Sequence, residues 1–316
     1  MRAIRHHRFG PPDVLVLEDV PDPEPAPGQL RVRVEAAGVH LLDTSIRSGT
    51  SFGPMERPDL PMVPGREVAG TVDAVGEGVP QTWLGARVVA HLGLASGGYA
   101  TRAVVAADRV YVIPDGMTAE IAVAAIGTGR TAAGILDQVE MGPDDVVVVT
   151  AAAGGLGVLL VQAAVAAGAR VVGVAGGPDK VELVRGLGAH DVIDYLRDGW
   201  ADLVPAPTIV LDSVGGEVGR DLHDRLVPGG QLVRYGWSSG EQNEHNDPDR
   251  TVVEVLGPAI LANLPRLERS ALDAAADGSR VPLVTTFPLA DAAGAHRALE
   301  ERRTTGKVVL VTGAGT

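Results

Sequence analysis

The glycine-rich segment after Thr150 has the residue types and spacing of a phosphate-binding turn. Residues 146–149 are four consecutive valines, as expected of a strand buried on both faces. The chain then fits the pattern A-x-G-x-x-G through Ala152, Gly154 and Gly157. Small residues at these positions allow a tight turn, close approach of a pyrophosphate to the backbone, and close packing of the next helix on the strand.

The helix predicted after this turn also favours binding of an anionic group. It is predicted from Gly155 to Ala167, so the amides of Gly155 and Leu156 lie in its first turn. First-turn amides and the positive end of the helix dipole attract anionic groups. A glycine-rich turn without a ligand is the alternative, but the strand–turn–helix–strand order favours a dinucleotide site.

The end of the next predicted strand bears on the choice between the two nicotinamide cofactors. An NAD-type site needs Asp or Glu there, to accept a hydrogen bond from the ribose 2′-hydroxyl. The strand instead ends in Gly176 and Gly177, and Lys180 follows in the first turn of the next helix. The sequence therefore favours NADPH, although Lys180 could be a solvated helix residue. Asp179 either interferes with a 2′-phosphate or caps the helix.

Metal and thiol chemistry are not expected. The chain has no cysteine, which excludes disulfides, iron–sulfur clusters, thiolate zinc sites and cysteine nucleophiles. Among 27 cationic residues only Lys180 and Lys307 are lysine. A coding bias towards arginine explains this, or these two positions need a compact ammonium group. Seven histidines show no metal-ligand spacing: His6, His7, His91, His190, His223, His245 and His296.

Composition limits the class of partner. The chain has 316 residues, a formal net charge of −13 and 3% aromatic residues. An acidic surface with few aromatics argues against nucleic acid or an anionic membrane as the main partner. No apolar signal segment is visible near Met1, and the apolar stretch 158–173 is interrupted by polar residues and glycine. We expect a soluble, cytoplasmic protein.

Three stretches of different character must position these residues. Up to about residue 120, β-branched runs separated by turns predict a β-barrel or sandwich, with a short helix after Gly38. From about 120 to 260, strands alternate with helices, which predicts a parallel, doubly wound α/β sheet with right-handed crossovers. The rest mixes helices and strands. The expected strands are 30–34, 67–75, 86–91, 99–105, 110–113, 146–149, 171–175, 191–195, 209–212, 232–235, 284–287 and 308–311, and the later helices are 179–187, 217–226, 259–277 and 290–302.

Motifs along nearly the whole chain carry a resemblance to a known family. They lie at 38–49, 64–70, 151–157 with Gln162, 212–215, 236–240 and 306–310. With them the chain resembles the zinc-free quinone oxidoreductase (zeta-crystallin-like) branch of the medium-chain dehydrogenase/reductase superfamily. This implies a GroES-like β-barrel catalytic domain of residues 1–122 and 265–316. A Rossmann NADP-binding domain of residues 123–264 is inserted between them, with the active site in the cleft.

The resemblance also implies roles for individual residues. Lys180 and Tyr195 would bind the 2′-phosphate, with Gly176 and Gly177 leaving room for it. Zinc-containing relatives have a His where this chain has Arg66, so metal-assisted alcohol oxidation is not expected. The remaining residues expected to face the cofactor are Thr131, Ser213, Gly236, Ser238 and Lys307.

Two departures from the family pattern fall on the catalytic candidates His40, Asp43 and Ser45. His40 stands where the family commonly has Asn, and Ser45 where it often has Tyr. His40 either donates a hydrogen bond or proton to the substrate oxygen or packs as a neutral ring. Asp43 could instead form a helical ion pair with Arg47, spaced i,i+4. Three aromatic residues either shape a substrate pocket or pack in the core or on the surface: Phe52, Trp237 and Phe287.

The function expected from these features is NADPH-dependent, zinc-independent transfer of a hydride to a quinone. One alternative is reduction of an enoyl or alkenal substrate, that is, an α,β-unsaturated carbonyl compound. Another is an NADPH-binding protein without catalytic activity. The resemblance also implies a homodimer, since relatives often pair their sheets edge to edge.

Overall fold

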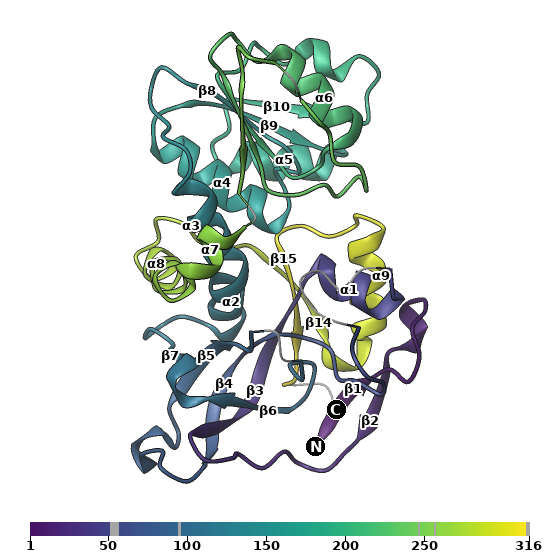
Figure 1. Ribbon diagram of the computed structural model, residues 1–316, viewed down its shortest axis with the longest axis vertical. Helices are drawn as coiled ribbons and strands as arrows, with labels where there is room; N and C mark the ends of the chain where they lie inside the picture. The colour runs from purple at the N-terminus through teal and green to yellow at the C-terminus, as the bar shows by residue number, and fades with distance from the viewer. Residues whose placement is uncertain (51–56, 94–95, 246, 256, 314–316) are drawn as a thin grey trace. The chain divides into compact units, whose positions relative to one another are not determined.

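The chain folds into two compact units, one of which contains both ends of the sequence. The computed structural model describes residues 1–50, 57–93, 96–245, 247–255 and 257–313. Unit 1 comprises Met1–Gly127 and Leu283–Thr316, and unit 2 comprises Thr128–Pro282. In Figure 1 the purple N-terminal strands and the yellow strands from the end of the chain lie in the same unit.

Unit 1 is built around a mixed sheet in the order β14-β15-β3-β4-β5-β7, with β6 also paired to β3. Its longest strands are antiparallel to each other. In β3 the apolar residues Leu30, Val32 and Val34 alternate with polar ones and are buried, so one face of the strand forms the core. The strands of unit 1 are β1 (Arg2–Arg5), β2 (Val16–Asp19), β3 (Gln29–Val39), β4 (Glu67–Val75), β5 (Arg87–His91), β6 (Arg102–Ala106), β7 (Val110–Val112), β14 (Val284–Pro288) and β15 (Lys307–Val311).

In the described part of unit 1 this sheet is accompanied by the α-helices α1 (Leu41–Ser48), α2 (Ala119–Ala124) and α9 (Ala292–Glu300). α1 begins after His40, whose backbone N–H donates to the carboxylate of Asp43 at 2.8 Å. It ends at Gly49, whose φ of +81° suits glycine. Both caps are encoded locally, which is why the sequence predicted this short helix.

Unit 2 contains a six-stranded sheet in the order β10-β9-β8-β11-β12-β13, and every pairing is parallel. The predicted doubly wound sheet is therefore confirmed. Both faces of this sheet are buried. Val147 and Val149 of β8 belong to one apolar cluster, and Val148 belongs to another. The strands are β8 (Val146–Val149), β9 (Arg170–Ala175), β10 (Asp191–Asp194), β11 (Ile209–Asp212), β12 (Gln231–Arg234) and β13 (Thr251–Glu254).

The helices predicted for unit 2 are present, but one of them is divided. A single helix was expected over 259–277, but α7 ends before Asn263 and α8 begins at Leu264. Pro265 explains the restart, since proline is tolerated in the first turn of a helix and not in its interior. The helices are α3 (Arg130–Leu136), α4 (Gly155–Ala166), α5 (Pro178–Gly186), α6 (Gly216–Arg225), α7 (Pro258–Ala262) and α8 (Leu264–Ala276).

The two units meet at residues 127/128 and 282/283, whereas the sequence analysis expected boundaries at 122/123 and 264/265. The second boundary differs because α8 packs against α3 within unit 2. Arg130 on α3 forms an ion pair with Glu268 on α8 at 2.7 Å. Gln162 on α4 also holds the chain after α8, because its amide donates to the carbonyl of Val281 and accepts from its N–H, both at 2.9 Å.

The segment Ala119–Leu136 was not predicted as a helix. It runs through α2, a π-helical turn (Ala125–Gly129) and α3. Its length and apolarity would suffice to cross a bilayer, but 67% of it is buried inside the structure. Burial on most sides identifies it as a core helix, and explains why no polar face marks it in the sequence.

Candidate active site

The glycine turn adopts the strand–turn–helix geometry predicted for it. The first hydrogen bond of α4 runs from Val158 N to Gly154 O at 3.0 Å, so the amides of residues 155–157 precede the helical ladder. Ala151 has a φ of +45°. A Cβ at Gly157 would overlap the carbonyl oxygen of Ala151 and lie 2.7 Å from the Cα of Ala152. This backbone fits a diphosphate, because side chains are absent where it must approach.

β11 and β12 are parallel neighbours, so the loops that follow them lie side by side at the carboxyl ends of the strands. Asp212, buried at the end of β11, accepts hydrogen bonds from Thr150 Oγ1 at 3.0 Å and from Val214 N at 2.9 Å. Burial raises the pKa of Asp212, although these hydrogen bonds oppose the rise. Asp212, which the sequence analysis quoted in the motif 212–215 without giving it a role, thus fixes the turn that carries Ser213.

The structure brings together three of the residues expected to line the cofactor site. Ser238 N donates to Ser213 O at 3.0 Å, and a Cβ at Gly236 would lie 3.0 Å from the same oxygen. The adjacent Trp237 is 45% exposed. Thr131 is half-buried on α3. The roles proposed for these residues stay predictions.

The expected adenosine end of the site lies where β9 and β10 finish. A Cβ at Gly176 would lie 2.8 Å from the ring of Tyr195, so glycine there makes room for the tyrosine. Gly177 has a φ of +88° and N-caps α5, on which Lys180 is half-buried. The sequence analysis found no acid at the end of this strand and named only Asp179 nearby, but Asp194 accepts a hydrogen bond from Gly177 N at 3.0 Å. That acid comes from β10, not from β9.

In unit 1 a buried carboxylate joins two of the predicted site residues. Glu67, at the start of β4, is fully buried. One carboxylate oxygen contacts His40 Nε2, and the other lies 2.9 Å from the Nζ atom of Lys307, which is 5% exposed. A Cβ at Gly127 would lie 2.6 Å from Oε2, so glycine there leaves space for the carboxylate. The cluster His40–Glu67–Lys307 thus links α1, β4 and β15.

The charges in this cluster are balanced within unit 1. Burial acts to raise the pKa of Glu67, but His40, Lys307 and His91 outweigh it and hold that pKa well below its usual value. Glu67 is therefore ionised and compensated by Lys307. The Nε2 atom of His40 is buried against the carboxylate, so this nitrogen is not the donor to a substrate oxygen that the sequence analysis considered. Glu67 lies in the motif 64–70, but no spacing rule pairs it with Lys307.

Asp43 lies in a second buried network and does not pair with Arg47. Arg47 instead forms an ion pair with Glu300 on α9 at 2.6 Å, so the alternative of an i,i+4 pair with Asp43 is wrong. Tyr99 donates its hydroxyl proton to Asp43 Oδ2 at 3.2 Å. The Tyr99 hydroxyl can donate only once, so His296 Nε2, 3.1 Å from that hydroxyl, donates to the Tyr99 oxygen. Asp43 thus positions the start of α1.

This network makes unfolding of the protein sensitive to acid. Burial lowers the pKa of His296 to about 4, so the unfolded chain binds a proton before the folded one does. The contribution of neutral His296 to the free energy of unfolding is fully present above about pH 6.5. It decreases by roughly 3 kcal/mol in total as the pH drops to about 4. In His296→Gln, which cannot titrate, chemical unfolding should show a loss smaller by about 2 kcal/mol between pH 7.5 and pH 5. Equal losses in both proteins would refute this assignment.

The other predicted residues lie apart from these clusters or outside the described chain. Ser45 is half-buried on α1, and its carbonyl accepts from Gly49 N at 3.0 Å. Phe287 on β14 packs against the core of unit 1. Phe52 lies outside the described residues.

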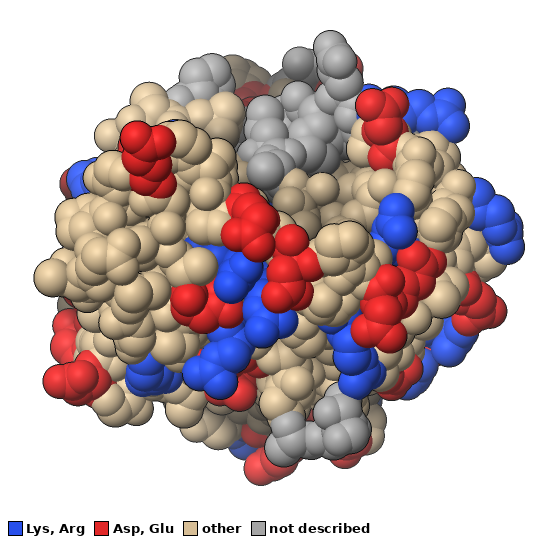
Figure 2. Space-filling view, turned by 90° about the horizontal axis from the view of Figure 1, so that it is seen from below, with Lys and Arg blue, Asp and Glu red and all other residues tan. Residues whose placement is uncertain are grey.

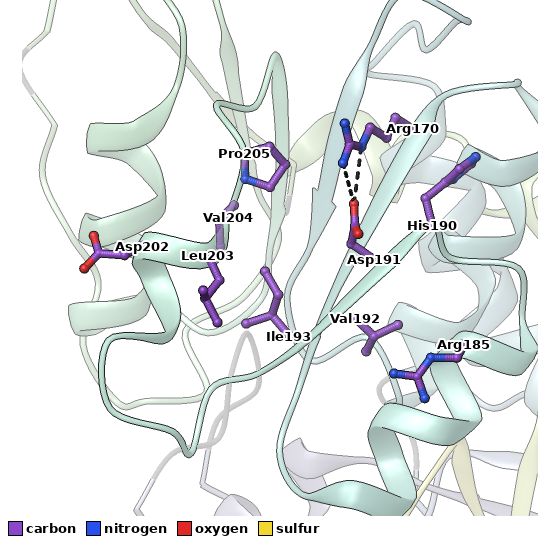
Figure 3. Close-up of a pocket in the computed structure, with 10 residues that line it drawn as sticks. All are labelled: Arg170, Arg185, His190, Asp191, Val192, Ile193, Asp202, Leu203, Val204 and Pro205. Carbon is purple, nitrogen blue, oxygen red and sulfur yellow. Dashed lines mark hydrogen bonds and ion pairs between the residues drawn. The ribbon is translucent and has the colours of Figure 1, made fainter.

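A pocket of about 440 Å³ lies at the β10 edge of the unit 2 sheet. Figure 3 shows Arg170 beside Asp191 in its wall, with Pro205 across from them and Leu203 beside Ile193. Arg170 and Asp191 are the first residues of β9 and β10, whereas ligands of doubly wound sheets bind at the carboxyl ends of strands. The pocket is therefore separate from the glycine turn.

Comparison with known proteins decides the family. Residues 26–115 match the alcohol dehydrogenase GroES-like domain, and residues 187–310 match a family described as zinc-binding dehydrogenase. The chain is 33% identical to a quinone oxidoreductase of Pseudomonas aeruginosa, covering 98% of this chain and 99% of that protein. This chain belongs to the quinone oxidoreductase branch of the medium-chain dehydrogenase/reductase superfamily. The predicted GroES-like fold of unit 1 is confirmed.

Two further relatives illustrate the range of this branch. The chain is 34% identical to a 2-haloacrylate reductase of a Burkholderia species, with 96% of this chain and 97% of that protein covered. The solved structure of Escherichia coli quinone oxidoreductase complexed with NADPH matches with a TM-score of 0.86 at 29% identity, covering 99% and 100% of the two chains. Both relatives extend over unit 1 and unit 2.

The described residues of the present chain do not fit a zinc ion. The sequence has no cysteine, and the described residues contain no group of three or more His, Asp or Glu side chains able to hold a metal. The carboxylate of Glu67 already faces the ammonium of Lys307. A divalent cation at Glu67 would have to displace that positive charge.

Proposed function

We propose that this protein is an NADPH-dependent, zinc-independent oxidoreductase that transfers a hydride to a quinone. The observation that carries the proposal is the glycine turn, where Gly154, Gly155 and Gly157 lack side chains and the amides of residues 155–157 precede the hydrogen-bonded ladder of α4. The E. coli relative whose structure holds NADPH supports it. Bound NADPH supplies the hydride from C4 of its nicotinamide ring.

The chain's own residues bind and orient this cofactor. The amides that precede the ladder of α4 bind the diphosphate, and Lys180 and Tyr195 bind the 2′-phosphate. Ser213 and Ser238 of unit 2, joined by a backbone hydrogen bond, line the channel of the cofactor. Holding the donor and acceptor carbons about 3–3.5 Å apart lowers the barrier by several kcal/mol without a side-chain nucleophile.

Reduction of an α,β-unsaturated carbonyl compound is the second candidate. The relative named 2-haloacrylate reductase favours it, because a haloacrylate is an α,β-unsaturated acid. Hydride addition to its β-carbon places negative charge on the carbonyl oxygen, which needs a hydrogen-bond donor. Ser45 and the cofactor ribose are the candidate donors once His40 Nε2 is assigned to Glu67.

A panel of acceptors separates these functions. We expect the protein to oxidise NADPH with quinones and to keep its rate after exhaustive chelation. Turnover with enones or haloacrylates alone would favour the second candidate, and tight NADPH binding without turnover would identify a protein without catalytic activity. Loss of activity on chelation that zinc restores would contradict the zinc-independent assignment.

The proposed partners are a small-molecule acceptor and a second copy of the chain. On the face drawn in Figure 2, the described acidic and basic side chains are interleaved, as on an ordinary solvated surface. β13 is an edge strand of the unit 2 sheet and could pair with its copy in a homodimer. Light scattering with size-exclusion chromatography tests this.

A further inference from the structure

A carboxylate reaches the end of β9 from the neighbouring strand. Asp194 is the last residue of β10 and is in register with Ala175, the last residue of β9. Its Oδ1 atom accepts hydrogen bonds from Gly177 N at 3.0 Å and Leu196 N at 3.1 Å. An acid is thus tied to the Gly176–Gly177 turn, where an NAD-type fingerprint places one at the end of its own strand.

This carboxylate carries a full negative charge. The hydrogen bond from Gly177 N, with that from Leu196 N, lowers the pKa of Asp194 below its usual value. Arg197, three residues further along the chain, has its Nε atom 4.0 Å from Oδ2. The side chain of Arg197 is 77% exposed, whereas that of Asp194 is 14% exposed. Solvent therefore screens the arginine more than it screens the carboxylate.

The surrounding groups place opposite charges around one small turn. The Tyr195 ring packs against Gly176, and Lys180 lies in the first turn of α5 beyond Gly177. A 2′-phosphate carries up to two negative charges at neutral pH, while the 2′-hydroxyl of NADH carries none. Lys180 therefore favours the phosphate and Asp194 opposes it.

We propose that Asp194 is a specificity-determining residue that limits the preference of this site for the 2′-phosphate of NADPH over the 2′-hydroxyl of NADH. The inference rests on the proposed dinucleotide site. It concerns the adenosine end alone, so it can be tested with nucleotides that lack nicotinamide.

Asp194→Asn removes the charge and keeps the structure of the turn. The Asn Oδ1 can accept the same two backbone hydrogen bonds. Calorimetry with 2′,5′-ADP and 5′-AMP measures the effect on the full chain. We expect Asn to tighten 2′,5′-ADP binding about threefold to tenfold, as expected for one unit charge acting across a solvated turn. Binding of 5′-AMP should change by less than about twofold.

Two further variants complete the experiment. Asp191→Asn removes a charge from the other end of the same strand, where Asp191 pairs with Arg170, and should leave the ratio of the two affinities unchanged. Lys180→Ala should weaken 2′,5′-ADP about tenfold with little effect on 5′-AMP, as expected for loss of one charge-assisted contact. The gain in Asp194→Asn should shrink at high salt.

The outcomes separate this inference from the proposed function. If the wild-type chain binds both nucleotides and Asp194→Asn leaves their affinity ratio unchanged, Asp194 does not determine specificity and the dinucleotide site stands. If the wild-type chain binds neither nucleotide nor NADPH, the proposed function and this inference both fail.

Discussion

Gly157→Ala is expected to weaken NADPH binding by about a hundredfold or more. The added Cβ would overlap the carbonyl oxygen of Ala151 and lie 2.7 Å and 2.8 Å from Cα and C of Ala152. All three neighbours are backbone atoms, which cannot rotate away as a side chain could. The start of α4 must therefore move away from the turn, and the amides that face the diphosphate move with it. Overpacking of this kind costs about 1–3 kcal/mol, and about 3 kcal/mol corresponds to the expected loss.

The matched control is Gly186→Ala, at the end of α5 in the same unit. A Cβ at Gly186 has open space within 4 Å among the described residues, and its φ is not positive. Alanine is a better helix former than glycine, so this variant should bind NADPH normally and unfold at a slightly higher temperature. Wild-type affinity in Gly157→Ala, measured by the quenching of protein fluorescence, would show that the turn does not bind the diphosphate.

Lys307→Met is expected to lower the free energy of unfolding by about 3 kcal/mol at neutral pH. Methionine nearly matches the length of the lysine side chain but removes the ammonium that lies 2.9 Å from Glu67. The carboxylate would stay fully buried without the ammonium, beside the imidazoles of His40 and His91. Breaking one partner of a buried ion pair costs far more than the net value of the pair. Urea unfolding at pH 7.5 measures the loss.

A double-mutant cycle separates the stranded charge from lost packing. Glu67→Gln combined with Lys307→Met leaves no buried charge in the pair, so most of the lost stability should return. The glutamine amide introduced by Glu67→Gln has nearly the size of the carboxylate that the glycines at 38 and 127 accommodate. If the double variant is as unstable as the sum of the single variants, the ion pair is not the cause.

Most strands were predictable because the apolar pattern of a short segment alone indicates a buried strand. β4, β8 and β11 begin and end where the sequence placed them, since each is a β-branched or apolar run with turn residues after it. The core segment Ala119–Leu136 was missed because it is apolar on most sides and lacks a polar face. β13 was missed because it is short and adjoins a polar stretch.

The candidate site was predictable only where its geometry is local. The spacing of Ala152, Gly154 and Gly157 is a property of one turn, and the structure has that turn. The contacts of Glu67 with His40 and Lys307 depend on how three distant segments pack. The contact of Asp194 with Gly177 depends on the register of β10 beside β9. No spacing along the chain encodes either arrangement.

The position of β15 in the sheet order sets a limit on folding during protein synthesis. Unit 2 is a continuous segment, Thr128–Pro282, so all of its strands have left the ribosome before residues 307–311 are made. β3 pairs with β15 along Ala36–Val39, so the nascent unit 1 has an open sheet edge during that interval. Glu67 likewise has no lysine beside it until translation reaches residue 307. We therefore expect unit 2 to reach its native state first and unit 1 to close once residues 307–311 have emerged.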